Sequence, residues 1–195
     1  MGSAVLLKGK PQTSRVAVCA TLAFVLLLRH SDLRIGDAVT LERERITGDK
    51  LFLYTAKTGT PVCCPLPEFV LNALEAAPKF SERYFFWTGE SKLASATGDW
   101  QRALKGVFNE AGIPDGHAHR FRDTFAVGLL QAGVPMERVS VLLGHSSIKV
   151  TEKHYSPWVR ARQEQLEADV RRTWGEPLPE TKGTLQAHEK QSVLN

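Results

Sequence analysis

Residues 145–158 read HSSIKVTEKHYSPW, and the interpretation of the whole chain depends on this stretch. It places Tyr155 ten residues after His145, the last residue of a Leu-Gly-His turn. Ser146 or Ser147 is suited to cap a helix that runs toward the tyrosine. Taken alone, the phenol is best explained as a core residue with its hydroxyl at the surface. A chemical role depends on what the preceding chain supplies.

The composition is that of an ordinary globular protein, with 195 residues, 43% hydrophobic and 24% charged. A net charge of +4 favours an anionic partner without identifying one. The three cysteines, Cys19, Cys63 and Cys64, are odd in number and lack C-x-x-C spacing. We therefore expect neither a disulfide framework nor a zinc site, and a reducing intracellular compartment. No cofactor and no metal site are expected.

An apolar run over 17–28 follows several basic residues and superficially resembles a signal peptide. It is shorter than the ~20 residues that span a bilayer, and no small-x-small cleavage site closes it. We interpret residues 15–28 as a helix capped by Ser14 and buried nearly all round, with secretion as the lesser alternative.

The remaining patterns predict an α+β fold, mainly helical with a small antiparallel three-stranded sheet. One domain is expected over 14–174, after a linker or expression remnant at 1–13 and before a disordered tail at 175–195. Strands are predicted at 42–46, 51–56 and 62–64, and helices at 67–76, 99–111, 121–130, 137–143, 148–155 and 159–174.

Two segments carry unusual side chains. Arg34 is embedded among apolar neighbours, so it either has an anion waiting for it or pairs with Asp32 or Asp37 on a solvated turn. Residues 117–126, HAHRFRDTFA, combine two histidines and two arginines at the start of a predicted helix. Lys57 lies in the turn of the second hairpin, where most lysines are simply solvated.

Together these motifs resemble the catalytic domain of the tyrosine recombinases, the phage integrase family, over residues 14–158. The motifs are LRIGD at 33–37, KTG at 57–59, HRFRDTFA at 119–126, LLGHS at 142–146 and TEKHYSP at 151–157. Two H-x-x-R patterns overlap, and we choose His119 with Arg122 because the family's arginine directly precedes a DTFA-like stretch.

The resemblance implies the fold of DNA breaking-rejoining enzymes and a site in which each position has the expected residue type. Tyr155 would be the nucleophile. Two arginines and a histidine would hold the scissile phosphate, His119 would accept a proton or organise that site, and Lys57 would act as general acid. The full set is Arg34, Lys57, His119, Arg122, His145 and Tyr155.

The expected function is site-specific cleavage and rejoining of double-stranded DNA, without metal or ATP, in a bacterial, archaeal or phage-encoded cytoplasmic protein. Self-association on DNA, from dimer to tetramer, is expected. No association with a membrane is expected. The alternatives are a noncatalytic DNA-binding module and a type IB topoisomerase with the same chemistry. Only thirteen residues precede the first helix, whereas the family usually carries an N-terminal helical domain, so an isolated catalytic domain or a minimal relative is expected.

Overall fold

The computed structural model describes residues 15–145 and 147–174, apart from the side chain of residue 162. The chain divides into two compact units, Met1–Tyr155 and Ser156–Asn195, which are described separately. The predicted linker and tail at 1–13 and 175–195 lie outside the described residues. The elements are α1 (Arg15–Ser31), α2 (Ile35–Val39), η1 (Arg43–Arg45), β1 (Ile46–Thr47), β2 (Lys50–Tyr54), β3 (Pro61–Pro65), α3 (Glu68–Ala76), α4 (Leu93–Glu110), α5 (His119–Gln131), α6 (Met136–Leu142) and α7 (Ile148–Thr173).

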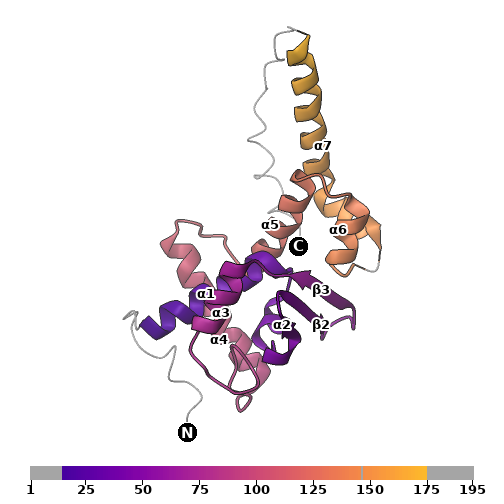
Figure 1. Ribbon diagram of the computed structural model, residues 1–195. Coiled ribbons are helices and arrows are strands. Elements are labelled where there is room, and N and C mark those ends of the chain that lie inside the picture. Colours follow the sequence, from indigo (N-terminus) through magenta and orange to yellow (C-terminus); the bar gives the residue numbers. More distant parts are fainter. Residues whose placement is uncertain (1–14, 146, 175–195) are drawn as a thin grey trace, which may run out of the picture. The chain divides into compact units, whose positions relative to one another are not determined.

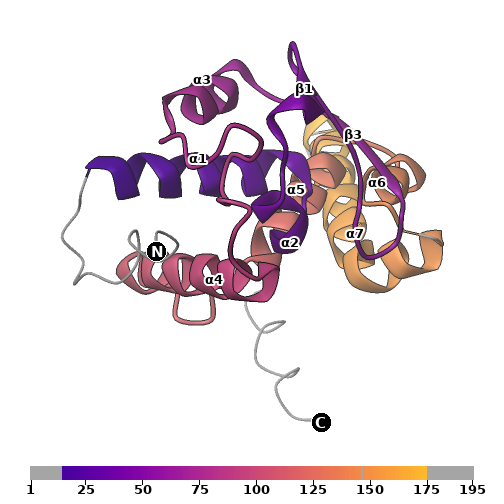
Figure 2. The same cartoon turned by 90° about the horizontal axis from the view of Figure 1, so that it is seen from below.

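Helix α1 is the central element of the first unit. It contacts α2, α3, α4 and α5, and Figure 2 shows it running between α3 and α4. Phe24 is fully buried at its centre and stacks on Trp100 of α4, with ring centroids 4.1 Å apart. Leu22 on the opposite face is 52% exposed, so the prediction of a helix buried all round was wrong for that face. The neighbouring elements cover only part of the surface of α1, so some of its apolar residues stay exposed.

The sheet confirms the predicted antiparallel meander, in the order β1-β2-β3 (Figure 1). Residues alternate between exposed and buried along β2 and β3, as expected for a sheet with one covered face. In β3, Cys64 faces the core and Cys63 faces outward. The three cysteines are free.

Two predicted boundaries were wrong. Residues 43–45 of the first predicted strand form the 3-10 helix η1, which leaves β1 only two residues long. The charged side chains there serve a tertiary network instead: Glu42 accepts hydrogen bonds from Arg45 and Arg83. Helix α4 begins at Leu93, six residues before its predicted start, because Ala96 adds a further buried turn to its core-facing stripe.

A second apolar cluster forms around α5 and α6. Its buried members are Ala126, Leu130, Val139, Leu143 and Tyr155. The tyrosine ring is thus part of a core and only 5% exposed. This packing fixes the position of the phenol relative to the first turns of α5.

Helix α7 continues through Pro157, whereas the sequence predicted separate helices before and after it. The proline comes two residues after Tyr155, and the boundary between the units falls at residues 155 and 156. In the second unit the exposed large apolar residues are Trp158, Val159, Leu166 and Val170 of the helix and Trp174, which follows it. Among the described helices, none is long and apolar enough to cross a membrane.

Candidate active site

Arg122 is the buried centre of the candidate site. It lies one turn into α5 and its side chain is only 3% exposed. Its Nη1 donates to the carbonyl oxygen of Asp32 at 2.8 Å, and its Nη2 donates to the carbonyl oxygen of Leu143. Burial lowers the pKa of the guanidinium, and Asp32 opposes that shift. One side chain thereby joins the end of α1, the start of α5 and the turn after α6.

The carboxylate of Asp32 lies between two arginines. Its Oδ2 is 3.1 Å from Nη1 of Arg122, and Arg34 also acts on it electrostatically. Asp32 is 1% exposed and has a φ of 61°, a left-handed conformation that aspartate tolerates better than most residues. Burial raises its pKa to about 7, although both arginines oppose the rise.

Arg34 follows this turn at the N-cap position of α2. Its side chain is half-buried, and its Nη1 is buried without a hydrogen-bond partner among the described residues. Arg34 thus interacts electrostatically with Asp32, as one alternative expected, but the aspartate is buried rather than solvated. Arg34 is an incompletely paired cation held beside Arg122.

Replacing Asp32 with asparagine is expected to remove a pH dependence of folding stability. The folded pKa is raised to about 7, so the stability contributed by the protonated group is complete below about pH 4 and is lost as pH rises through 7. Asparagine also tolerates positive φ. Between pH 5 and 8, wild type should lose on the order of 3 kcal/mol more stability than Asp32→Asn in urea unfolding. Equal losses of stability in wild type and Asp32→Asn would contradict a raised pKa for the buried carboxylate.

His145 follows the turn that ends α6. Its ring Nδ1 shares a hydrogen bond of 2.8 Å with the hydroxyl of the fully buried Thr151, which fixes the ring. Burial lowers the pKa of His145, and Arg122 and Arg34 lower it further. Gly144 has a φ of 59°, and a Cβ there would lie 3.2 Å from Thr60. The glycine thus allows the histidine-bearing turn to approach the β2–β3 hairpin.

Tyr155 is held by its hydroxyl, which donates to Oδ1 of Asp123 at 2.8 Å. Burial raises the pKa of the phenol, and the bond to Asp123 raises it further. His119, four residues before Asp123 on α5, has its Nε2 3.7 Å from the same oxygen. Burial lowers the pKa of His119, so its imidazole is mostly neutral at pH 7.

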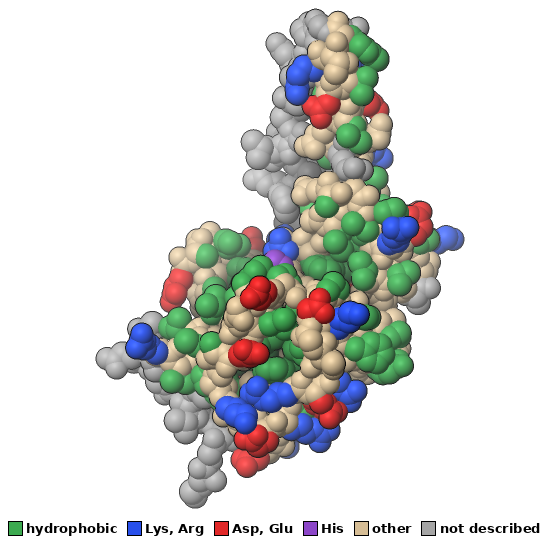
Figure 3. All heavy atoms as spheres, in the orientation of Figure 1, with side chains coloured by type: hydrophobic (Ala, Val, Ile, Leu, Met, Phe, Trp, Pro, Cys, Tyr) green, Lys and Arg blue, Asp and Glu red, His purple; other side chains and the backbone are tan. Residues whose placement is uncertain are grey.

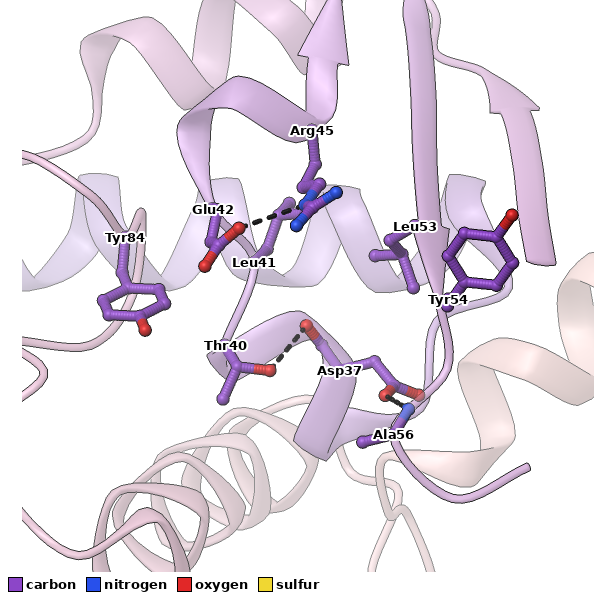
Figure 4. A pocket seen from close by; sticks show the side chains of 9 residues that line it. All are labelled: Asp37, Thr40, Leu41, Glu42, Arg45, Leu53, Tyr54, Ala56 and Tyr84. Atoms are coloured by element: carbon purple, nitrogen blue, oxygen red, sulfur yellow. Dashed lines mark hydrogen bonds and ion pairs between the residues drawn. The ribbon is translucent and has the colours of Figure 1, made fainter. Parts of the chain in front are cut away.

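Lys57 is exposed in the turn between β2 and β3. The backbone N–H of its neighbour Ala56 donates to Oδ1 of Asp37 at 2.9 Å (Figure 4). Asp37 is buried on α2, and this bond ties the turn to the helix that follows Arg34. A pocket of about 250 Å³ lies beside this connection, and Tyr84 lines its far side.

Five of the six predicted positions are electrostatic neighbours. Arg34, Arg122 and His119 all act on the pKa of His145, and Arg122 acts on that of Tyr155. Lys57 stands apart on its hairpin, connected through Asp37. Asp32, Asp37 and Asp123 were not among the predicted site residues, although Asp32 and Asp37 were considered as partners of Arg34. Asp123 lies four residues after His119 on α5.

The sequence profile of the phage integrase family matches residues 10–158, which is most of the chain. The chain belongs to the phage integrase family. Its match spans the candidate site from Arg34 to Tyr155 and confirms the resemblance drawn from the motifs.

Relatives of this phage integrase chain include tyrosine recombinases from bacteria and archaea. XerA of Pyrococcus furiosus is 31% identical over 137 residues, which are 66% of this chain and 47% of XerA. XerD of Mycobacterium tuberculosis is 29% identical over 154 residues, which are 73% of this chain and 49% of XerD. The aligned part of the chain therefore spans about half the length of these relatives.

Solved structures of phage integrase relatives share the fold. A XerH recombinase gives a TM-score of 0.62 at 16% identity, covering 85% of this chain and 48% of XerH. The catalytic domain of bacteriophage HP1 integrase gives 0.53 at 21% identity, covering 76% of this chain and 79% of that domain. The predicted fold of a tyrosine recombinase catalytic domain is thereby confirmed.

Proposed function

We propose that this protein cleaves and rejoins DNA strands through a covalent 3′-phosphotyrosyl intermediate on Tyr155, as a site-specific recombinase or integrase. One observation carries the proposal: Arg34 presents a buried guanidinium nitrogen that has no hydrogen-bond partner within residues 15–145 and 147–174, and Arg34 and Arg122 both act electrostatically on His145. A group of cationic and hydrogen-bonding side chains that is incompletely neutralised suits a phosphate diester.

The proposed chemistry stores the energy of the broken bond. The phenol oxygen of Tyr155 attacks phosphorus and the 5′ oxygen leaves, so a phosphotyrosine ester replaces the phosphodiester. Arg34, Arg122 and His145 hydrogen-bond the nonbridging oxygens, where negative charge increases in the transition state. Lys57 protonates the leaving oxygen from its exposed hairpin. Attack by a free 5′-hydroxyl then rejoins the strand without ATP or a metal ion.

Surface charge gives less support for DNA recognition than the candidate active site does. Over the helices and sheet of the first unit, Figure 3 shows Lys and Arg side chains interspersed with Asp and Glu. The face shown has no extended patch of one sign. We therefore base substrate recognition on phosphate held at the buried arginines, with backbone contacts by exposed groups such as Lys57.

Double-stranded DNA and further copies of this chain are the proposed partners. The XerH structure is of a recombinase bound to palindromic difH substrate, and a λ integrase fragment is a dimer bound to a core site. The exposed apolar residues of the second unit, Trp158, Val159, Leu166, Val170 and Trp174, offer a surface for a second copy in a dimer or tetramer on DNA. We place the protein in the cytoplasm of a bacterium or archaeon, where its DNA substrate lies.

A nicked suicide substrate tests the proposed function. The short strand beyond the cleavage site diffuses away after cleavage, so the covalent adduct accumulates. Incubation in EDTA should yield a protein–DNA adduct that survives denaturing electrophoresis. DNA binding that weakens with salt without an adduct would instead support a noncatalytic binding module. Relaxation of any supercoiled plasmid, without a preferred site, would favour a topoisomerase.

A further inference from the structure

The structure identifies the group next to the phenolic proton of Tyr155. The hydroxyl donates to Oδ1 of Asp123 at 2.8 Å, a normal hydrogen-bond distance. His119, for which the resemblance implied a role as proton acceptor or as organiser of the phosphate site, has its Nε2 3.7 Å from that same oxygen. Asp123 therefore accepts the hydrogen bond of the nucleophile, and the histidine lies within ion-pair distance of the same carboxylate.

Helix α5 fixes this arrangement. His119 and Asp123 are four residues apart, so they lie on one face of the helix. Arg122 turns the other way, into the protein, where Asp32 and Leu143 hold it. The carboxylate of Asp123 is 39% exposed, so water and a DNA phosphate can reach its surroundings. One turn of α5 thus offers a guanidinium to the phosphate site and a carboxylate to the nucleophile.

The resting state keeps the proton on the phenol. Because burial and the Asp123 carboxylate both raise the pKa of Tyr155, a free phenolate does not form before DNA arrives. The proton must leave while the oxygen–phosphorus bond forms, when the phenol becomes much more acidic. A base already within hydrogen-bond distance is what this timing requires.

We propose that Asp123 is a further catalytic residue, which accepts the phenolic proton of Tyr155 during attack on phosphorus. This role rests on the proposed function. The bond from the tyrosine oxygen to phosphorus forms as the bond from phosphorus to the 5′ oxygen breaks. The phenolic proton goes to Oδ1 of Asp123, and the 5′ oxygen takes a proton from Lys57. Rejoining reverses both transfers.

Asp123→Asn is the main test, because asparagine keeps the size of the side chain and loses the basic carboxylate. On a suicide substrate, we expect Asp123→Asn to form the adduct in a single turnover about 10² times more slowly than wild type, or slower still. Its DNA affinity should be unchanged. An equal or faster rate would overturn the role, and a faster one would mean that the carboxylate only restrains the phenol. If wild type itself formed no adduct, the proposed function would fail and this role with it.

A sulfur-substituted substrate separates base from acid. When sulfur replaces the 5′ bridging oxygen at the scissile phosphate, the thiolate leaves without needing a proton. Lys57→Ala should then regain most of its lost rate, whereas Asp123→Asn should stay slow, because the phenol still has to lose its proton. Recovery of both variants would overturn the assignment of Asp123 as base.

A further measurement does not depend on activity. The chain has three tyrosines, Tyr54, Tyr84 and Tyr155, so NMR of tyrosines labelled with ¹³C at Cζ can follow each phenol during a pH titration. In Asp123→Asn the ionisation of Tyr155 should move to lower pH, because the carboxylate raises the pKa of the phenol. An unchanged Tyr155 would show that the contact is absent in solution, whatever the cleavage assay gives.

Discussion

Tyr155→Phe is expected to bind DNA with wild-type affinity and to form no covalent adduct. Phenylalanine keeps the ring that packs with Leu130 and Leu143 in the second apolar cluster, and it removes the oxygen that would bond to phosphorus. The fold loses one hydrogen bond, to Asp123, which contributes about 1 kcal/mol. The measurements are a salt-dependent binding titration and a suicide-substrate cleavage assay on the same preparation.

Tyr54→Phe is the matched control for this change. Tyr54 is 63% exposed on β2 and belongs to the same unit, so its hydroxyl is accessible to solvent. Its variant should form adduct at the wild-type rate. If Tyr155→Phe still crosslinks to DNA, the nucleophile is another residue and the proposed mechanism is wrong at its first step.

Arg122→Met should both slow cleavage strongly and destabilise the fold. Loss of one transition-state donor commonly lowers the rate by about 10²–10³. Loss of one partner of a buried ion pair costs about 3–5 kcal/mol, because Asp32 then lies buried beside Arg34 alone. Since Arg122 lowers the pKa of Asp32, the destabilisation should be greater at pH 8 than at pH 5. Urea unfolding at the two pH values and single-turnover cleavage measure both effects.

Two variants control for these effects of Arg122. Arg120→Met removes an exposed arginine from the same turn of α5, the arginine of the other H-x-x-R pattern, and should leave cleavage and stability near wild type. Adding Asp32→Asn to Arg122→Met should recover much of the stability at pH 8 and none of the cleavage. Equal losses in Arg120→Met and Arg122→Met would mean that the wrong H-x-x-R pattern was chosen.

Sequence alone predicted the elements and residues that depend on local pattern. The alternating strands around Lys57, the short helix before Gly144 and the helix through Phe121 and Phe125 follow from periodicity and turn residues within a few positions. The boundaries that failed, η1 in place of a strand and the early start of α4, are set by tertiary partners such as Arg83 for Glu42 and the core around Ala96.

The three aspartates of the site show why the remainder was not predictable. Asp32 meets Arg122 across 90 residues, Asp37 meets Ala56 across 19, and Asp123 meets Tyr155 across 32. Each contact depends on how helices and hairpin pack, and an aspartate in a turn or on a helix surface is usually just solvated. These pairings, and the electrostatic interactions that they create in the site, became visible only in the structure.

The chemical identity of the protein–DNA linkage is the most direct test of Tyr155 as the nucleophile. The trapped adduct would be digested with protease and nuclease, its modified peptide sequenced by mass spectrometry, and the released DNA end tested for a free 5′-hydroxyl. The expected result is a nucleotide joined through its 3′-phosphate to Tyr155, and a 5′-hydroxyl on the other product. A linkage to another residue, a 5′-phosphate linkage, or DNA bound without any linkage would contradict it.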